Sequence, residues 1–305
     1  MQGYVVRRVF QALLVLIGVS LATFMVSHLT GDPVNLLVPE STPREEREEL
    51  RRHLGLDRPI LEQYASFVWK AAQGDLGYSY VQRTRVSELV LERLPATLEL
   101  AFFSFALAIA IAVPLGVTIA LKRNSWTDFI CTGLAMIGQA APNFWIGLML
   151  IVIFAVQLQI LPVSGYGGFA YMVLPAVTLA LQSASRLTRL VRASVLDVLG
   201  SDHVRTAHAK GLRRPVVLWG HILRNALIPV VTMAGLELAE LLSGAFITET
   251  IFAWPGIGRL GVEAITKRDF PVIQGVVLVG AVVFVVINLL VDLLYAAIDP
   301  RVKLA

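Results

Sequence analysis

The chain alternates long apolar runs with short polar segments. Six runs are long enough to cross a hydrocarbon layer of about 30 Å at a helical rise of about 1.5 Å per residue, which predicts six transmembrane helices in an all-α integral membrane protein. The first run is followed by a turn sequence and not by a small-residue cleavage site, so we expect a span and not a signal peptide. The runs cover roughly residues 9–29, 94–121, 129–158, 171–198, 226–248 and 271–298.

A long polar segment of mixed charge separates the first two runs. Within it, Thr42 to Glu45 forms a capping box with proline at the first helical position, and Gly55 can end that helix. Residues 59–72 have the pattern of a second, amphipathic helix. These two helices are expected outside the membrane, either as a rigid cap on the spans or as a landing surface for an extracytoplasmic partner. The predicted divisions are a first span (1–30), an extracytoplasmic helical segment (31–93) and a core transmembrane domain (94–305).

The charge of the loops predicts the orientation of the chain. Basic residues are concentrated in loops 122–128 and 186–224 and in the tail with Arg301 and Lys303. Loop 159–170 has no charged residue, and the charges of 249–270 are balanced. Because short basic loops stay in the cytoplasm, both termini are expected there, in a multi-pass protein of the bacterial cytoplasmic (inner) membrane.

The amino-acid composition argues against several classes of function. Hydrophobic residues make up 56% of the chain and charged residues 16%, which is too apolar for an ordinary soluble core. The basic residues lie beside apolar runs, so they indicate membrane topology and not nucleic-acid binding. With Cys131 as the single cysteine, no disulfide within the chain is possible, and the histidines have no metal-ligand spacing. No nucleophile and base can be paired, which favours a protein that is not an enzyme by itself.

A strongly basic stretch interrupts the apolar pattern between Asp202 and Pro229. Glycine at 211 and proline at 215 predict two short helices with a turn between them, lying flat on the cytoplasmic face within loop 199–224. Such a charge cluster is costly in hydrocarbon and indicates a docking site. Its cations are Arg205, Lys210, Arg213, Arg214 and Arg224, against the single carboxylate Asp202.

Two carboxylates lie within the fifth apolar run. Glu237 and Glu240 are three residues apart and share a helix face, with Ser243, Gly244 and Thr248 following at helical spacing. Carboxylates at membrane depth are expected to face an aqueous path or a cation. One hypothesis is a translocation path that favours a cationic or amine-bearing solute. The alternative is pairing with Arg186 or Arg189, or with a partner subunit.

Four long motifs carry a family resemblance: HVRTAHAKGL, HILRNALIPVVT, ETIFAWPGIGRLGVEAITKRDFPVIQG and NLLVDLLYAAIDPR. In this order and spacing they resemble the permease subunits of bacterial ABC importers in the dipeptide, oligopeptide, glutathione and nickel group. The resemblance extends from the N-terminal VVRRVFQALLVLIGVS to the end of the chain. It implies a type I importer permease fold with short outer helices and a cytoplasmic coupling helix.

The resemblance also implies partners. They are a second, similar permease, two ABC ATPase subunits and an extracytoplasmic solute-binding protein, with no nucleic acid. The chain has no G-x-x-x-x-G-K-[ST] phosphate loop, which agrees with ATP and Mg²⁺ being bound by the ATPase subunits and with no cofactor on this chain.

In this family the basic segment corresponds to the loop that contacts the ATPase. Arg205 and Thr206 stand where the general loop has Glu and Ala, so contacts cannot be copied from the general form. Anchoring of Arg213 and Arg214 to anionic membrane lipid is the alternative. The expected coupling residues are Arg205, Ala207, Lys210, Gly211, Leu212, Arg213 and Arg214.

The loop after the fifth run has two interpretations, a re-entrant outer gate or an ordinary structured loop. Its residues are Glu249, Trp254, Pro255, Gly256 and Gly258. Peptide is favoured as the solute because the spans show no His or Cys relay for nickel, while nickel, glutathione or another small solute stays the alternative. A stand-alone channel or ion-coupled carrier is the alternative class, for which inverted repeats would be expected.

Overall fold

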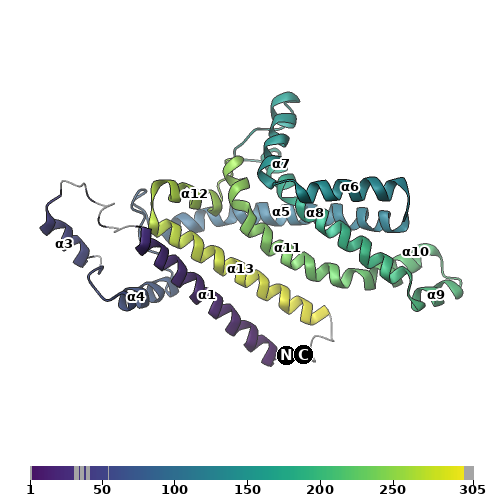
Figure 1. Ribbon diagram of the computed structural model, residues 1–305, viewed down its shortest axis with the longest axis horizontal. Helices are drawn as coiled ribbons and strands as arrows, with labels where there is room; N and C mark the ends of the chain where they lie inside the picture. Colours follow the sequence, from purple (N-terminus) through teal and green to yellow (C-terminus); the bar gives the residue numbers. More distant parts are fainter. Residues whose placement is uncertain (1, 31–33, 35–37, 39–41, 54, 299–305) are drawn as a thin grey trace.

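The computed structural model describes residues 2–298, except 31–33, 35–37, 39–41 and 54. In this part of the chain the regular structure is helical, with one isolated bridge between Tyr78 and Arg85. The elements, shown in Figure 1, are α1 (Gln2–Thr30), α3 (Arg44–His53), α4 (Ile60–Ala72), α5 (Val86–Leu121), α6 (Trp126–Ala140), α7 (Asn143–Leu150), the π-helix η1 (Ile151–Gln157), α8 (Phe169–Leu199), α9 (Asp202–Ala209), α10 (Arg214–Val216), the π-helix η2 (Val217–Leu223), α11 (Arg224–Ile251), α12 (Ile257–Lys267) and α13 (Phe270–Ile298).

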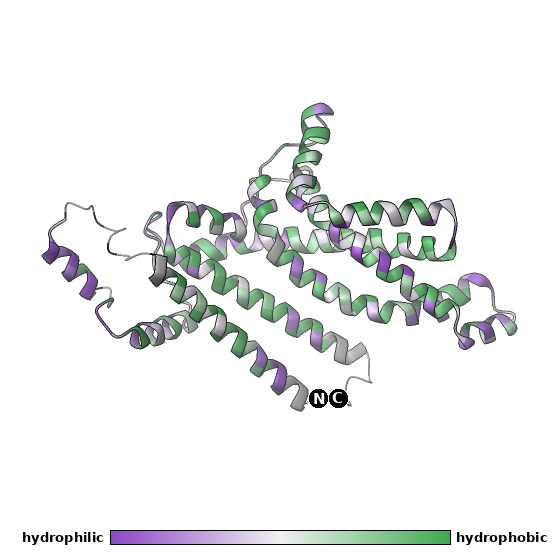
Figure 2. Ribbon diagram, viewed as in Figure 1, coloured by the Kyte–Doolittle hydropathy of each residue, from purple (hydrophilic) through white to green (hydrophobic). Residues whose placement is uncertain are grey.

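Among the residues that the structure describes, four helices are long and apolar enough to span a membrane by themselves, and the bent pair α6 and α7–η1 would make a fifth span. Helix α8, where a span was predicted, is not among them because its apolar part ends at Arg186, and the count of six stays a prediction. Hydrophilic residues gather on α3 and around α9 and α10, at opposite ends of the molecule, while the long helices are mostly hydrophobic (Figure 2). The four spans are Val6–Val26, Val86–Leu121, Arg214–Leu242 and Phe270–Leu293.

The third apolar run does not form one straight helix. It bends by 107° between α6 and α7, at Ala141 and Pro142. Proline lacks a backbone N–H and disfavours the helical conformation of the residue before it, and Ala141 is accordingly extended (ψ 131°). The segment α7–η1 consequently points away from the direction of α6 (Figure 1).

Helices α5, α8 and α11 form the core, and small residues let them approach closely. A Cβ on Gly116 of α5 would overlap Val191 of α8, and a Cβ on Gly138 of α6 would overlap Ser185 of α8. Helix α13 meets α11 in the same way at Gly235. The buried side chains between α5, α8 and α11 are Ala96, Leu100, Ala176, Leu179, Leu241 and Ala245.

Helix α1 lies beside α13 and carries the outer helix α4. Arg8 of α1 pairs with Asp292 of α13 at 3.1 Å. Near the other end of α1, the Ser20 and Tyr64 hydroxyls are hydrogen-bonded at 2.8 Å and Phe24 packs against the Tyr64 ring. The two helices predicted in segment 31–93 are found as α3 and α4, while their extracytoplasmic position stays a prediction; Gly55 takes a left-handed conformation (φ 70°) after α3. Helix α5 begins at Val86, so the predicted outer segment 31–93 includes its first two turns.

Candidate coupling surface, membrane ion cluster and outer loop

The basic segment folds into one short helix, α9, and a glycine turn, as predicted, but the second predicted short helix is the beginning of a continuous helix that starts at Arg214. Gly211 follows α9 in the left-handed conformation (φ 75°), and its N–H donates to the carbonyl oxygen of His208 at 2.9 Å. Arg213 then caps α10 with extended backbone, and Pro215 lies in the first turn. The turn ends one helix and redirects the chain because glycine tolerates this φ at no steric cost.

One side of α9 is packed against the membrane helices. Val204 and Ala207 are 2% and 3% exposed and join a hydrophobic cluster with Val191 and Val195 of α8 and Val217 of η2. Ala207 was expected to contact an ATPase, but its side chain faces inward. It lies three residues after Val204 on the buried stripe of α9, so it fixes this helix to the core and is not a surface contact.

The other side of the segment is a surface at the end of the molecule opposite α12 (Figure 1). It combines cations with apolar side chains: Val216 is 50% and Trp219 72% exposed. Both residues lie in the predicted cytoplasmic loop 199–224, but they were not among the expected coupling residues, which were chosen for their charge and for the glycine turn. We define the coupling surface as Arg205, Lys210, Gly211, Leu212, Arg213, Arg214, Val216 and Trp219, all exposed.

The two carboxylates of α11 share one guanidinium from α8. Arg186 donates through Nε to Oε1 of Glu237 at 2.6 Å and through Nη2 to Oε2 of Glu237 at 2.7 Å. The same Nη2 lies 3.1 Å from Oε2 of Glu240. The Glu237 side chain is 2% exposed, that of Arg186 22% and that of Glu240 61%. Pairing with Arg186, the alternative left open by the sequence, is therefore present in the structure.

The remaining residues of the predicted path differ in placement. Thr248 is fully buried, and within the described part of the chain its hydroxyl has no hydrogen-bond partner. Eight residues at about 3.6 per turn place it about 80° around α11 from Glu240. Because Thr248 is buried whereas Glu240 is exposed, the two side chains do not lie on one exposed surface of this chain. Ser243 and Gly244 lie within α11, but their side chains are outside the described residues.

A second ion pair, not predicted from the sequence, joins α6 and α8. Arg192 donates to both carboxylate oxygens of Asp128 at 2.8 Å. Asp128 also accepts from the backbone N–H of Asn124 at 3.1 Å and from the Thr132 hydroxyl at 3.2 Å. The chain contains several arginines in α8, and no spacing rule assigns one of them to a carboxylate 64 residues earlier.

The outer loop is organised around a buried carboxylate. Glu249, in the last turn of α11, is fully buried; it accepts from the Thr97 hydroxyl at 2.7 Å and from the Arg259 backbone N–H at 3.0 Å. The Thr97 oxygen in turn accepts from the Ile257 N–H at 2.9 Å. A Cβ on Gly256 would overlap the Glu249 carboxylate, so this position requires glycine.

Trp254 is a second buried side chain that holds the same loop in place. Its indole Nε1 donates to the carbonyl oxygen of Ala96 at 2.8 Å, and the side chain is 1% exposed. The Tyr166 ring packs edge-on against it at 4.8 Å, and the Tyr166 hydroxyl donates to Glu99 at 3.1 Å. This hydrogen bond and the charge of Glu99 raise the pKa of the Tyr166 phenol. The loop is thus a packed, hydrogen-bonded structure on α5, and its role as a gate stays a prediction.

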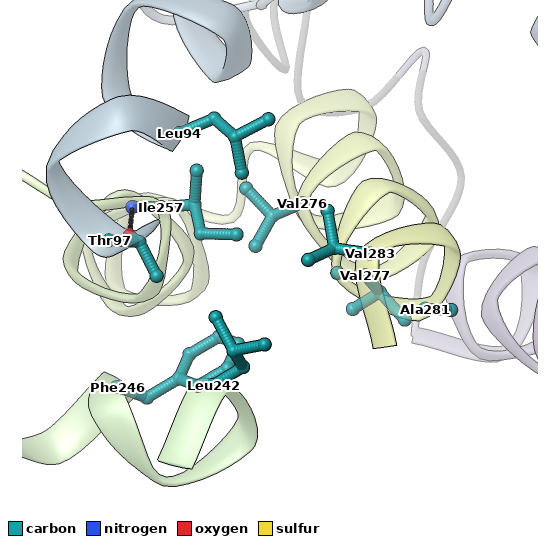
Figure 3. Close-up of a pocket in the computed structure, with 10 residues that line it drawn as sticks. Leu94, Thr97, Leu242, Phe246, Ile257, Val276, Val277, Ala281 and Val283 are labelled. Carbon is teal, nitrogen blue, oxygen red and sulfur yellow. Dashed lines mark hydrogen bonds between the residues drawn. The ribbon is translucent and has the colours of Figure 1, made fainter. Parts of the chain in front are cut away.

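An apolar cavity of about 190 Å³ lies beside this loop, between α5, α11, α12 and α13. Figure 3 shows Leu94, Phe246 and Val276 around it, with the hydrogen bond between Thr97 and Ile257 at its edge. Its lining offers almost no polar atoms beyond the Thr97 hydroxyl, so it does not suit a charged or hydrogen-bonding solute.

The fold and these surfaces define a class of protein, the membrane-embedded component of a transporter. Residues 112–304 match the family described as binding-protein-dependent transport system inner membrane component, and residues 1–101 match the N-terminal family of the same membrane component. The chain belongs to this family and is a multi-pass inner-membrane permease subunit.

Relatives of similar length cover the whole chain. It is 40% identical to the dipeptide transport system permease protein DppB of Escherichia coli K12, over 99% of both chains. It is 39% identical to the oligopeptide transport system permease protein AppB of Bacillus subtilis, over 99% of this chain and 100% of the relative. The glutathione transport system permease protein GsiC of Escherichia coli is 40% identical over 99% of both chains.

Solved structures agree on the fold. An inward-facing structure of the MetNI methionine ABC transporter aligns with a TM-score of 0.59 at 18% identity, covering 69% of this chain and 96% of that chain. At this identity the likeness is one of fold alone, and it supports the expected type I importer permease architecture.

Proposed function

We propose that this chain is the permease subunit of an ATP-driven importer that moves dipeptides or oligopeptides, delivered by a binding protein, across the cytoplasmic membrane. The observation that carries the proposal is the coupling surface. It joins a glycine turn, four cations and three exposed apolar side chains on a segment that continues directly into helix α11. Such a combination suits a protein partner, because apolar anchors and arginines dominate the energetics of protein interfaces.

The partners follow from the same surface. Two ABC ATPases would bind on the cytoplasmic side and hydrolyse ATP, with one of them seated on the coupling surface of this chain. A second, homologous permease would complete the path, and a solute-binding protein would dock on the outer side. This arrangement places both termini in the cytoplasm and takes α8 as the sixth span. Arg213 and Arg214 would contact either the ATPase or anionic lipid headgroups.

Glutathione is the second candidate solute. It is supported by the glutathione permease relative, which is as similar to this chain as the dipeptide permease. Glutathione is itself a tripeptide, so both candidates share an ammonium group, carboxylates and amide bonds.

The test is uptake by the assembled transporter. The chain is expressed with its second permease and two ATPases, reconstituted into liposomes and supplied with the solute-binding protein. We expect uptake of a labelled dipeptide that requires ATP and the binding protein, with glutathione measured in parallel. Transport by this chain alone without ATP would instead identify a self-contained channel or carrier.

A further inference from the structure

We propose that Glu240 is a specificity-determining residue of the translocation path, which receives the ammonium group of an amine-bearing solute in exchange for its contact with Arg186. The inference rests on the proposed permease function and identifies the charge that the solute must carry where it passes α11.

The two carboxylates are held by Arg186 in different ways. Glu237 receives two short hydrogen bonds and is buried, whereas Glu240 has one contact of 3.1 Å to an Nη2 that already serves Glu237. A bidentate, buried pair is costly to break, because it leaves an uncompensated charge. A single, solvent-accessible contact contributes little stability. Glu240 is therefore the carboxylate that can change partner while Arg186 stays with Glu237.

The depth of Glu240 restricts what its exposed side can face. It lies 16 residues after Arg224 and 11 before Ile251, which places it roughly 24 Å and 16 Å from the two ends of α11 at about 1.5 Å per residue. A carboxylate at this depth costs several kcal/mol against lipid. Since the side chain is 61% exposed, that side of α11 borders water or polar groups in the assembled transporter.

The residues around Glu240 make an otherwise uncharged wall. We define the Glu240 stripe as the exposed residues of α11 at three-, four- and seven-residue intervals on this face. The wall would offer a passing solute one charged group, and no cation is among its members. Its members are Pro229, Met233, Leu236, Glu240 and Ile247.

The net charge of the cluster formed by Arg186, Glu237 and Glu240 determines which solute charge it favours. One guanidinium and two carboxylates give a net charge of −1 at this level, while Arg189 lies one helical turn nearer the cytoplasmic end of α8. A solute ammonium at Glu240 neutralises the cluster, whereas a solute carboxylate meets an unbalanced negative charge. The cluster thus favours cationic groups and opposes anionic ones without any pocket of fixed shape.

The first experiment does not depend on the solute. In the assembled transporter carrying Cys131→Ala, Leu236→Cys on the Glu240 stripe is treated with membrane-impermeant methanethiosulfonates bearing either a trimethylammonium or a sulfonate group. We expect modification at this position, with a rate ratio that favours the cationic reagent and falls about tenfold when Glu240→Gln is added. Leu14→Cys, on the exposed apolar face of α1, is the control and should not react.

Absence of modification at position 236, or a rate ratio unchanged by Glu240→Gln, would overturn the inference. Neither result bears on whether the complex imports peptides, so the proposed function and this inference can fail separately.

The second experiment measures transport with saturating binding protein. We expect Glu240→Gln to lower the maximal uptake rate of a dipeptide with a free amino group about tenfold and to leave that of its N-acetylated form unchanged. Glu88→Gln, an exposed carboxylate in the first turn of α5, should alter neither rate. An equal loss for both solutes would contradict recognition of the ammonium group. A wild-type complex that imports neither solute would contradict the proposed function, and the modification rates would still decide the inference.

Discussion

The hydroxyl of Thr97 donates a hydrogen bond of 2.7 Å to the carboxylate of Glu249, 152 residues later in the chain. The same hydroxyl oxygen accepts the N–H of Ile257, so one small side chain connects α5, the end of α11 and the start of α12. The outer loop is held in place by this connection and by the Trp254 hydrogen bond to Ala96.

Replacing Thr97 by valine should destabilise the outer loop. Valine has the same shape but removes one hydrogen bond from the buried Glu249 carboxylate, which keeps the Arg259 N–H, and leaves the Ile257 N–H without its partner, at a cost of about 1–3 kcal/mol for such a group. We expect a lower unfolding temperature of the purified complex and faster proteolysis between Phe252 and Gly256. Thr97→Ser retains the hydroxyl and should behave nearly as wild type; equal loss in both variants would argue against the hydrogen bonds.

Replacing Gly211 by proline should uncouple transport. The φ of 75° is inaccessible to proline, and the Gly211 N–H that bonds His208 is lost. We expect membrane insertion to persist while ATPase binding, and with it ATP-driven uptake, falls at least tenfold. Gly74→Pro is the matched control, because Gly74 has φ 81° and an N–H bonded to Ala71 at the outer side. Retained uptake in the Gly211 variant would contradict the coupling assignment.

Removing the charge of Asp128 should loosen α6 from α8. Asp128→Asn leaves Arg192 without its carboxylate, and we expect a loss of about 1–3 kcal/mol, less than for a fully buried pair, because the Arg192 side chain is 29% exposed. Thermal unfolding of the purified complex measures it. The double variant Asp128→Asn, Arg192→Gln should recover part of the loss; simple additivity of the two single variants would show that the pair is not coupled.

Alkaline pH should weaken the loop that contains Tyr80. Burial, and secondly the charge of Asp269, raise the pKa of the Tyr80 phenol above its usual value of 10.0. The folded protein therefore retains this proton more strongly than the unfolded chain, and stability falls as pH rises from about 10 through the folded pKa. Tyr80→Phe removes the titration, so its unfolding temperature should decline less between pH 9 and 11. An identical decline in both proteins would contradict the assignment.

Local features of the fold were predictable because they depend on short-range chemistry. The capping box at Thr42, the left-handed Gly211 and the apolar runs each specify structure within a few residues. The bend at Pro142 also has a local cause, and it divides the third predicted run into two helices that together are still long and apolar enough for one broken span.

Contacts between distant helices were not predictable in the same way. Arg186 and Arg189 lie three residues apart on α8, so periodicity could not decide which of them meets Glu237. The inward direction of Ala207 depends on how α9 packs on α8, and the burial of Thr248 depends on the rotation of α11. These directions depend on tertiary packing, and a single sequence does not show which faces of two distant helices meet.

From Arg214 to Ile251 the backbone remains helical through α10, η2 and α11, and the junction residues Val217 and Leu223 keep right-handed helical dihedrals. No loop within these residues can absorb a displacement. A displacement of the turn at Gly211 would therefore be transmitted as a push or tilt along the helix to Glu249, so the proposed coupling surface and the loop after α11 are joined by continuous helix within a single subunit.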